Sequence, residues 1–239
     1  MSANYELKVF KSADELAEEA AEFIIRLSEE SIKARDRFII ALSGGTTPER
    51  LFRVLAEPSY AEKVNIEKTF VFWSDERCVP FNDERNNAHK AQQLLLNNIC
   101  IPAENIFAMP VNLPPAEAAE AYEKTLHGFL GDSERFDLIL LGLGEDGHTA
   151  SLFPDTDILN EHKRWVKEVY PKTQPEPRIT LTTPFINRAR NILFLVSGEN
   201  KREILQQVLN NKSAGQYPAQ LIHPTNGNLY WYTDIRISN

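Results

Sequence analysis

The chain has 239 residues and a formal net charge of −8 at pH 7, and it contains no dense run of Lys or Arg. This acidic balance argues against a nucleic-acid partner or an anionic membrane surface. With 42% hydrophobic and 25% charged residues, the composition is that of an ordinary globular protein. Residues 1–10 lack the basic start and apolar core of a signal peptide, and no apolar stretch is long enough to span a bilayer, so we expect a cytoplasmic protein.

Two cysteines, Cys78 and Cys100, are too few for a disulfide framework, and we expect free thiols in a reducing compartment. No histidine adjoins Cys78 in the sequence, so this residue lacks the base that would activate it as a nucleophile. The five histidines show no His-x-x-x-His spacing and the cysteines show no Cys-x-x-Cys spacing. We therefore expect no metal site.

Continuous apolar runs that are typical of buried strands alternate with amphipathic segments that are typical of helices. Strands are expected at 5–10, 37–42, 69–73, 106–109, 136–141, 165–170, 178–181 and 191–196, with an edge strand at 229–233. Helices are expected from the capping box of Ser12 with Glu15, from Thr47-Pro48 to about Leu55, over 88–95, from Pro114-Pro115, at Thr183-Pro184 and from Lys201. This alternation predicts a single α/β domain over 1–239, with a mainly parallel sheet flanked by helices on both faces.

Four polar segments, at 43–48, 74–77, 142–151 and 197–201, each follow an expected strand directly. In open α/β sheets, ligands bind beyond the carboxyl ends of the strands. We therefore expect the four segments to converge and to form the functional site. An acidic protein needs a locally positive pocket to bind an anion, so the few Arg and Lys residues in these segments are informative.

The first polar segment places two glycines between a strand and a helix N-terminus. The segment begins with Ser43, Gly44, Gly45 and Thr46. Backbone N–H groups, hydroxyls and the positive end of the helix dipole could hold a phosphate there. The segment lacks the Gly-Lys-Ser/Thr ending of a nucleotide P-loop, so ATP is not indicated. The alternative is a plain tight turn made with glycines.

Asp75, Glu76 and Arg77 place three charges at the end of the expected strand 69–73. The alternative for such a triplet is a solvated surface. At the binding edge of the sheet, however, Asp75 could bind sugar hydroxyls and Arg77 could meet an anionic or developing charge. Arg178 and Lys201 also lie at the ends of expected strands or loops. Together with Arg77 they would supply the positive pocket that an anionic ligand needs.

The third polar segment begins with a G-x-G-x-x-G spacing made by Gly142, Gly144 and Gly147. This spacing also occurs in dinucleotide-binding folds, but Glu145 and Asp146 would place carboxylates where a pyrophosphate needs N–H groups and positive charge. His148 could accept a proton from water and return it to a leaving oxygen, with Asp146 orienting the ring. A capping or structural histidine is the alternative, and a helical turn is expected at 149–153.

Four motifs occur in an order that resembles the 6-phosphogluconolactonase family: SGGTTP at 43–48, WSDERCVP at 73–80, GLGEDGHTASLFP at 142–154 and ENKREIL at 199–205. The likeness spans nearly the whole chain. Its most specific part is the ending HTASLFP, because glucosamine-6-phosphate deaminases usually continue differently after the histidine. One departure is Asn86-Asn87, where lactonases often carry Ser-Asn. The resemblance implies a fold similar to that of glucosamine-6-phosphate deaminase and ribose-5-phosphate isomerase.

The resemblance also implies hydrolysis of 6-phospho-D-glucono-1,5-lactone to 6-phospho-D-gluconate, in the oxidative branch of the pentose phosphate pathway. His148 would then be the general base, Asp146 would orient it, and Arg77 would help to stabilise the oxyanion. The residues expected to bind substrate are Ser43, Gly44, Gly45, Thr46, Asp75, Arg178 and Lys201. No cofactor is implied, the partner is the sugar-phosphate lactone alone, and a monomer is favoured.

Three other functions stay open at this point. In a deaminase or isomerase, Asp75 would abstract a proton from C2 of the sugar. A sugar-phosphate sensor without catalysis would normally accompany a DNA-binding helix-turn-helix, for which the chain has neither spare length nor a basic segment. A dinucleotide oxidoreductase would use the glycines that precede His148.

Overall fold

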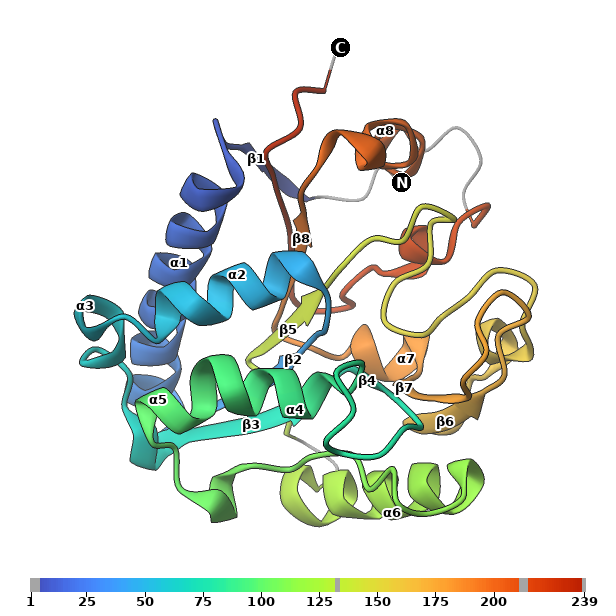
Figure 1. Cartoon of the computed structure of the whole chain (residues 1–239), viewed down its shortest axis with the longest axis horizontal. Coiled ribbons are helices and arrows are strands. Elements are labelled where there is room, and N and C mark those ends of the chain that lie inside the picture. Colours follow the sequence, from blue (N-terminus) through green and yellow to red (C-terminus); the bar gives the residue numbers. More distant parts are fainter. Residues whose placement is uncertain (1–4, 132–133, 211–214, 238–239) are drawn as a thin grey trace.

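Six parallel strands form a central sheet in the order β1-β9-β8-β5-β2-β3 (Figure 1). They are β1 (Glu6–Val9), β2 (Phe38–Leu42), β3 (Thr69–Trp73), β5 (Leu138–Leu141), β8 (Asn191–Val196) and β9 (Asn228–Thr233). The computed structural model describes residues 5–131, 134–210 and 215–237. Every residue of β2, β5 and β8 is buried, which explains why these strands read as continuous apolar runs.

A second sheet of three antiparallel strands has the order β4-β7-β6. Its strands are β4 (Asp75–Arg77), β6 (Val166–Val169) and β7 (Arg178–Leu181). Only Ser74 separates β3 from β4. The N–H of Ser74 donates to the carbonyl of Leu42 and its carbonyl accepts from the N–H of Leu181, both at 2.8 Å, so this residue joins the two sheets. The segment 74–77, expected only as polar chain after a strand, thus contains a strand of its own.

Helices pack on both faces of the large sheet. One face carries α1 (Ala13–Arg35), α2 (Thr46–Leu55) and the consecutive segments α4 (Asn87–Ala91), η2 (Gln92–Leu96) and α5 (Asn97–Ile99). The other face carries α6 (Pro115–Leu130), α7 (Thr183–Ile186) and α8 (Arg202–Leu209). Shorter helical pieces are α3 (Pro58–Ala61), η1 (Ile66–Lys68), η3 (Ala103–Asn105), η4 (Asp157–Asn160), η5 (Glu199–Lys201) and η6 (Pro218–Leu221).

Consecutive residues of β3 show how the two helical layers attach to the sheet, because side chains alternate between its faces. Val71 lines an apolar cavity together with Ile24 of α1 and Leu55 of α2. The next residue, Phe72, packs against Phe129 of α6 with 5.2 Å between ring centroids. The predicted mainly parallel sheet with helices on both faces is confirmed, whereas the extent of the domain, 1–239, stays a prediction.

The C-terminal strand β9 differs from expectation, because it lies between β1 and β8 rather than at an edge of the sheet. Its side chains meet helices on both faces. Tyr230 packs against Phe23 of α1 with 4.8 Å between ring centroids, and Trp231 lines a small cavity with Val208 of α8. The first and third strands, β1 and β3, therefore form the two edges.

Three other expectations are wrong in detail. Segment 106–109 forms only a single bridge between Ile106 and Val71 instead of a strand. Helix α2 begins at Thr46 with Gly45 as its N-cap, so Thr47 is not the cap. Helix α8 begins at Arg202, because 199–201 form the short helix η5. Among the described residues, no helix is both long and apolar enough to cross a membrane.

Candidate active site

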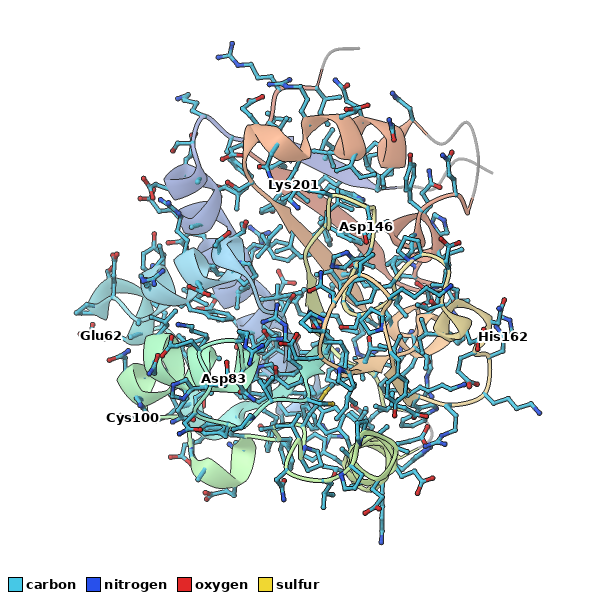
Figure 2. The ribbon with its side chains drawn as sticks, turned by 45° about the vertical axis from the view of Figure 1, so that its right-hand side comes forward. Glu62, Asp83, Cys100, Asp146, His162 and Lys201 are labelled. Carbon is cyan, nitrogen blue, oxygen red and sulfur yellow. The ribbon has the colours of Figure 1, made fainter. Side chains whose placement is uncertain are left out.

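A cleft of about 210 Å³ lies where the loops after β2, β5 and β8 meet the small sheet. The sequence-predicted site residues that line it are Ser43, Gly44, Gly45, Asp75, Arg77, His148, Arg178 and Lys201. The four polar segments thus converge as the position rule for parallel sheets requires. Thr46 is exposed at the first position of α2 and Asp146 lies behind the histidine, so neither lines the cleft. Figure 2 shows Lys201 and Asp146 in the upper part of the view, with Cys100 at the lower left.

The glycine turn after β2 is shaped by a side chain from α4. A Cβ on Gly44 would lie 1.8 Å from Oδ1 of Asn87, so only glycine leaves room for this amide. The Asn87 amide in turn donates to the backbone carbonyl of Asp75 at 3.0 Å. Gly45 adopts a φ of +108°, which L side chains rarely accept, and starts α2. Both glycines are therefore required by the geometry of the turn.

The loop after β5 holds His148 by backbone contacts. The N–H of Gly144 donates to the carbonyl of His148 at 2.8 Å, and the N–H of Gly147 donates to the carbonyl of Gly144 at 3.1 Å. A Cβ on Gly144 would lie 2.1 Å from Nδ1 of His148, so the imidazole packs directly over this glycine. On its other side the ring packs against Phe153, with 4.3 Å between centroids. The ring is thus fixed from two sides.

Asp146 orients the imidazole through Nδ1. Its Oδ1 lies 2.5 Å from Nδ1 of His148 and also accepts the backbone N–H of His148 at 3.1 Å. Burial alone would raise the pKa of Asp146, but the hydrogen bonds with His148 outweigh that effect and hold the pKa below its usual range. The ionised carboxylate favours the tautomer with the proton on Nδ1, which leaves Nε2 as the ring nitrogen that can accept a proton.

Two arginines stand side by side on the small sheet. Arg77 of β4 and Arg178 of β7 are direct partners in the antiparallel ladder. Burial lowers the pKa of Arg178; Asp75 opposes this shift and Arg77 adds to it. The Nε atoms of both arginines are buried and have no hydrogen-bond partner among the described residues. Because an unpaired buried donor is costly, this arrangement favours an anion in the cleft.

The remaining cation of the cleft, Lys201, comes from the chain after β8. Its side chain is 22% exposed, and Nζ lies 3.9 Å from Oε1 of Glu145. The amide of Asn200 donates to the same carboxylate oxygen at 2.6 Å. Glu145 therefore ties this cation to the histidine loop, so Lys201 stands on the β5 and β8 side of the cleft while the arginines stand on the small sheet.

The two acidic residues of β4 are buried, so the solvated-surface alternative for this triplet is wrong. Asp75 is 5% exposed, and its Oδ2 accepts a hydrogen bond of 2.6 Å from the hydroxyl of buried Ser151. Glu76 is 1% exposed and accepts the backbone N–H groups of Arg77, Asn87 and Ala88, each at 2.8 Å. Burial raises the pKa of Glu76 to about 7, although these hydrogen bonds oppose the shift. Glu76 thus ties α4, and with it the Asn87 side chain, to β4.

Comparisons with known proteins give the site its context. The family model of glucosamine-6-phosphate isomerases/6-phosphogluconolactonase matches residues 11–231. The chain belongs to this family. It is 38% identical to 6-phosphogluconolactonase of Nostoc sp. over 95% of both chains, and 36% identical to 6-phosphogluconolactonase of Homo sapiens over 95% of this chain and 90% of that one. The structure of 6-phosphogluconolactonase from Trypanosoma cruzi superposes with a TM-score of 0.88 at 28% identity, covering 98% of this chain and 95% of that one.

The family membership agrees with the loop geometry after β5, which does not form a dinucleotide site. A dinucleotide fingerprint needs a helix directly after its glycines. Here 143–156 contain turns and an isolated bridge but no helix, and Ala150 has a φ of +47° inside a turn closed by the hydrogen bond from the N–H of Leu152 to the carbonyl of Thr149. The helical turn expected at 149–153 is therefore wrong, and the oxidoreductase reading loses its structural basis.

Sequence reasoning did not name Asn87, and within segment 142–151 it did not single out Thr149 and Ser151 as site residues. Asn87 and Thr149 line the cleft, and Ser151 holds Asp75. The sequence points to Asn87 in part, since Asn86-Asn87 stands where lactonases often carry Ser-Asn. Asn86 caps α4 by accepting the N–H of His89 at 2.8 Å, so the substitution keeps the hydrogen bond that this position needs.

Cys78 is half-buried beside the site and is a free thiol, as is Cys100. Burial raises the pKa of Cys78 to about 11, and nearby Glu76 adds to the shift. A thiol with this pKa stays protonated at neutral pH and is a poor nucleophile. The described residues contain no group of three or more His, Cys, Asp or Glu side chains that could hold a metal.

Proposed function

We propose that this family member hydrolyses 6-phospho-D-glucono-1,5-lactone to 6-phospho-D-gluconate, the lactone-opening step of the oxidative pentose phosphate pathway. The observation that carries the proposal is that His148, which is paired with Asp146, lines a cleft that also presents Arg77, Arg178 and Lys201. A lactone carbonyl needs a base and an oxyanion stabiliser, and its phosphate needs cations. The cleft offers groups suited to all three tasks.

In the first step, Nε2 of His148 takes a proton from a water molecule whose oxygen attacks C1 of the lactone. The carbonyl π electrons move to oxygen, and the tetrahedral oxyanion is stabilised by the Arg77 guanidinium and by backbone N–H groups of the loops. Asp146 stabilises the imidazolium that forms and keeps its orientation. In the second step the oxyanion collapses, the bond between C1 and the ring oxygen breaks, and His148 returns its proton to that oxygen.

The other end of the substrate is held by binding groups at a distance from C1. Ser43, Gly44, Gly45 and Thr46 would supply N–H groups and hydroxyls to the 6-phosphate, with Arg178 and Lys201 supplying positive charge. Asp75 would accept hydrogen bonds from sugar hydroxyls. Binding energy gained at the phosphate places C1 near the base, which lowers the barrier of the chemical step. A cytoplasmic monomer that uses no cofactor and binds no nucleic acid completes the proposal.

A continuous assay of lactone opening with and without the 6-phosphate tests the reaction and the phosphate site together. After subtraction of spontaneous hydrolysis, we expect kcat/KM for the phosphorylated lactone to exceed that for glucono-1,5-lactone by about a hundredfold or more, because two charge-assisted contacts are lost with the phosphate. Lys201→Ala should reduce this preference, whereas Lys124→Ala on the exposed side of α6 should not.

Equal rates on the two lactones would contradict the phosphate site, and no enzymatic rate on either would contradict the hydrolase. Ammonia release from glucosamine 6-phosphate is measured in parallel. A rate there would support the deaminase alternative, in which Asp75 is a base. The bond from Ser151 to Asp75 instead suits a fixed acceptor for hydroxyl groups.

A further inference from the structure

A second cleft, of about 710 Å³, lies at the amino ends of the strands of the large sheet, whereas the active cleft lies at their carboxyl ends. It is lined by the end of α1, by the residues that begin β8 and by the turn that leads into β9. All the amino ends of parallel strands lie on one side of the sheet, so the length of the strands separates this cleft from His148. None of its lining residues takes part in the proposed hydrolysis.

Four arginines line this second cleft: Arg26, Arg35, Arg135 and Arg190. One carboxylate, Glu30, lines it with them. Asp137 behind the wall is 1% exposed and is shared, since Oδ1 accepts Nη2 of Arg35 at 2.7 Å and lies 3.3 Å from Nε of Arg190. The nearby Glu134 is paired with Arg37 at 3.3 Å. Positive charge therefore exceeds negative charge in the cleft, although the chain as a whole carries −8.

The guanidiniums of the cleft are not fully paired. Arg135 donates to a neutral acceptor, the backbone carbonyl of Asn226, at 3.2 Å. Nε of Arg190 is buried and makes no hydrogen bond to any described residue. Burial lowers the pKa of Arg190; Arg35 and Arg135 add to this shift, and Asp137 and Glu134 oppose it. An anion in the cleft would supply acceptors to Arg135 and Arg190 and would offset the excess of positive charge.

The walls of the cleft are held in place by short backbone contacts. A Cβ on Gly227 would lie 2.4 Å from the carbonyl oxygen of Ala189 and 2.6 Å from that of Arg190. The N–H of Asn228 donates to the carbonyl of Arg190 at 2.9 Å, and its side chain donates to Asn191 at 3.0 Å. The cleft is thus a built feature of the fold and does not depend on flexible surface side chains alone.

We propose that this second cleft binds a small polyanion with two or more linked phosphate groups. Planar guanidiniums pair with phosphate oxygens in a two-pronged geometry, and the four arginines come from three separate parts of the chain: α1, the residue before β8 and the chain before β5. The volume also exceeds what one phosphate fills. This site is additional to the phosphate-binding part of the active cleft and does not depend on the proposed reaction.

Calorimetric titration with inorganic tripolyphosphate at fixed ionic strength tests the proposal. We expect tripolyphosphate to bind the parent protein at a saturable site. The affinity of this site should be at least about tenfold weaker in Arg26→Gln/Arg135→Gln, since each lost guanidinium removes a charge-assisted hydrogen bond. Neither arginine has an ion pair with a described carboxylate. If the double variant unfolds, Arg135→Gln alone replaces it as the test variant.

Arg50→Gln/Arg53→Gln on α2 is the matched control and should bind tripolyphosphate as the parent does.

Lys201→Ala separates the two clefts. The binding of tripolyphosphate that is weakened in Arg26→Gln/Arg135→Gln should keep its parental affinity in Lys201→Ala. Binding that is lost only in Lys201→Ala would assign the ion to the active cleft and overturn the proposal. So would absence of binding, an equal loss in the α2 control, or binding of inorganic monophosphate as tight as that of tripolyphosphate.

Discussion

Two carboxylates beside the active cleft, Asp146 and Glu76, have opposite environments. The Asp146 side chain is 41% exposed and its hydrogen bonds with His148 keep its pKa low, whereas Glu76 is 1% exposed and burial raises its pKa to about 7. Asp146 keeps its charge and acts on an imidazole. Glu76 accepts three backbone N–H groups and fixes the chain. Exposure thus separates the carboxylate that the proposed chemistry uses from the one that holds β4 and α4 together.

The largest expected effect comes from removing the group on which Asp146 acts. His148→Ala should lower kcat by about 10²- to 10⁴-fold, the usual contribution of a placed proton-transfer group. The side chain is 27% exposed and fills no core position, so Tm should change little. His223→Ala, at an exposed residue, is the control and should keep full activity. Activity of His148→Ala equal to that of the parent would refute the role of the base.

Asp146→Asn keeps the size of the side chain but removes its charge. We expect kcat to fall by about tenfold to a hundredfold with KM nearly unchanged, because the amide no longer stabilises the imidazolium. Asp155→Asn is the control, since this exposed residue has a φ of +56° that asparagine also tolerates. A loss confined to KM would mean that Asp146 binds substrate and does not orient the base.

The contribution of Asp146 to the free energy of unfolding depends on pH in a defined direction. The pKa of Asp146 is lower in the folded chain than in the unfolded chain. Its contribution to the free energy of unfolding is therefore present above the unfolded pKa and is lost as the pH falls through the folded pKa. Asp146→Asn should remove this contribution, so the unfolding curves of variant and parent should approach each other in acid.

Glu76→Gln tests the architectural side of the comparison. An amide would turn an N–H toward the N–H of Ala88 or Asn87, and we expect the free energy of unfolding at pH 8 to fall by about 1–3 kcal/mol. Because the pKa of Glu76 is raised from 4.5 to about 7, its contribution is greatest below pH 4.5 and is lost as the pH rises through 7. The gap between parent and variant should therefore be wider at pH 5 than at pH 8, by up to about 3 kcal/mol.

Denaturant unfolding of parent and variant at the two pH values measures this gap. Glu104→Gln, at an exposed residue of η3, is the matched control and should show none. A gap that is independent of pH, or wider at pH 8, would contradict the environment described for Glu76. Residual kcat of a folded Glu76→Gln should stay well above that of His148→Ala, since Glu76 acts only through β4 and α4.

The large sheet could be predicted from the sequence because its strands are buried on both faces and read as uninterrupted apolar runs. The position of β9 could not, since its pairing with β1 joins the two ends of the chain. Strand β4 was missed for a related reason. Asp75 and Glu76 are tolerable in a buried strand only because Ser151 and the start of α4 satisfy them, and these partners are distant in sequence.

The candidate site was predictable to the extent that strand ends placed its loops together. Contacts across the cleft were not, as Asn87 over Gly44 shows: the glycine looked like a turn residue, and its real constraint is a side chain 43 positions later. The surroundings of Thr46 could not be predicted either. It belongs to the expected phosphate segment, but α2 begins two residues earlier than expected, and Thr46 is an exposed residue at its first position.

A crystal structure with bound 6-phospho-D-gluconate tests the central claim most directly. We predict the C1 carboxylate within hydrogen-bond reach of Nε2 of His148, and the phosphate against Gly45, Arg178 and Lys201. A product bound in the reverse orientation, with its phosphate at His148, or bound outside the cleft, would contradict the mechanism.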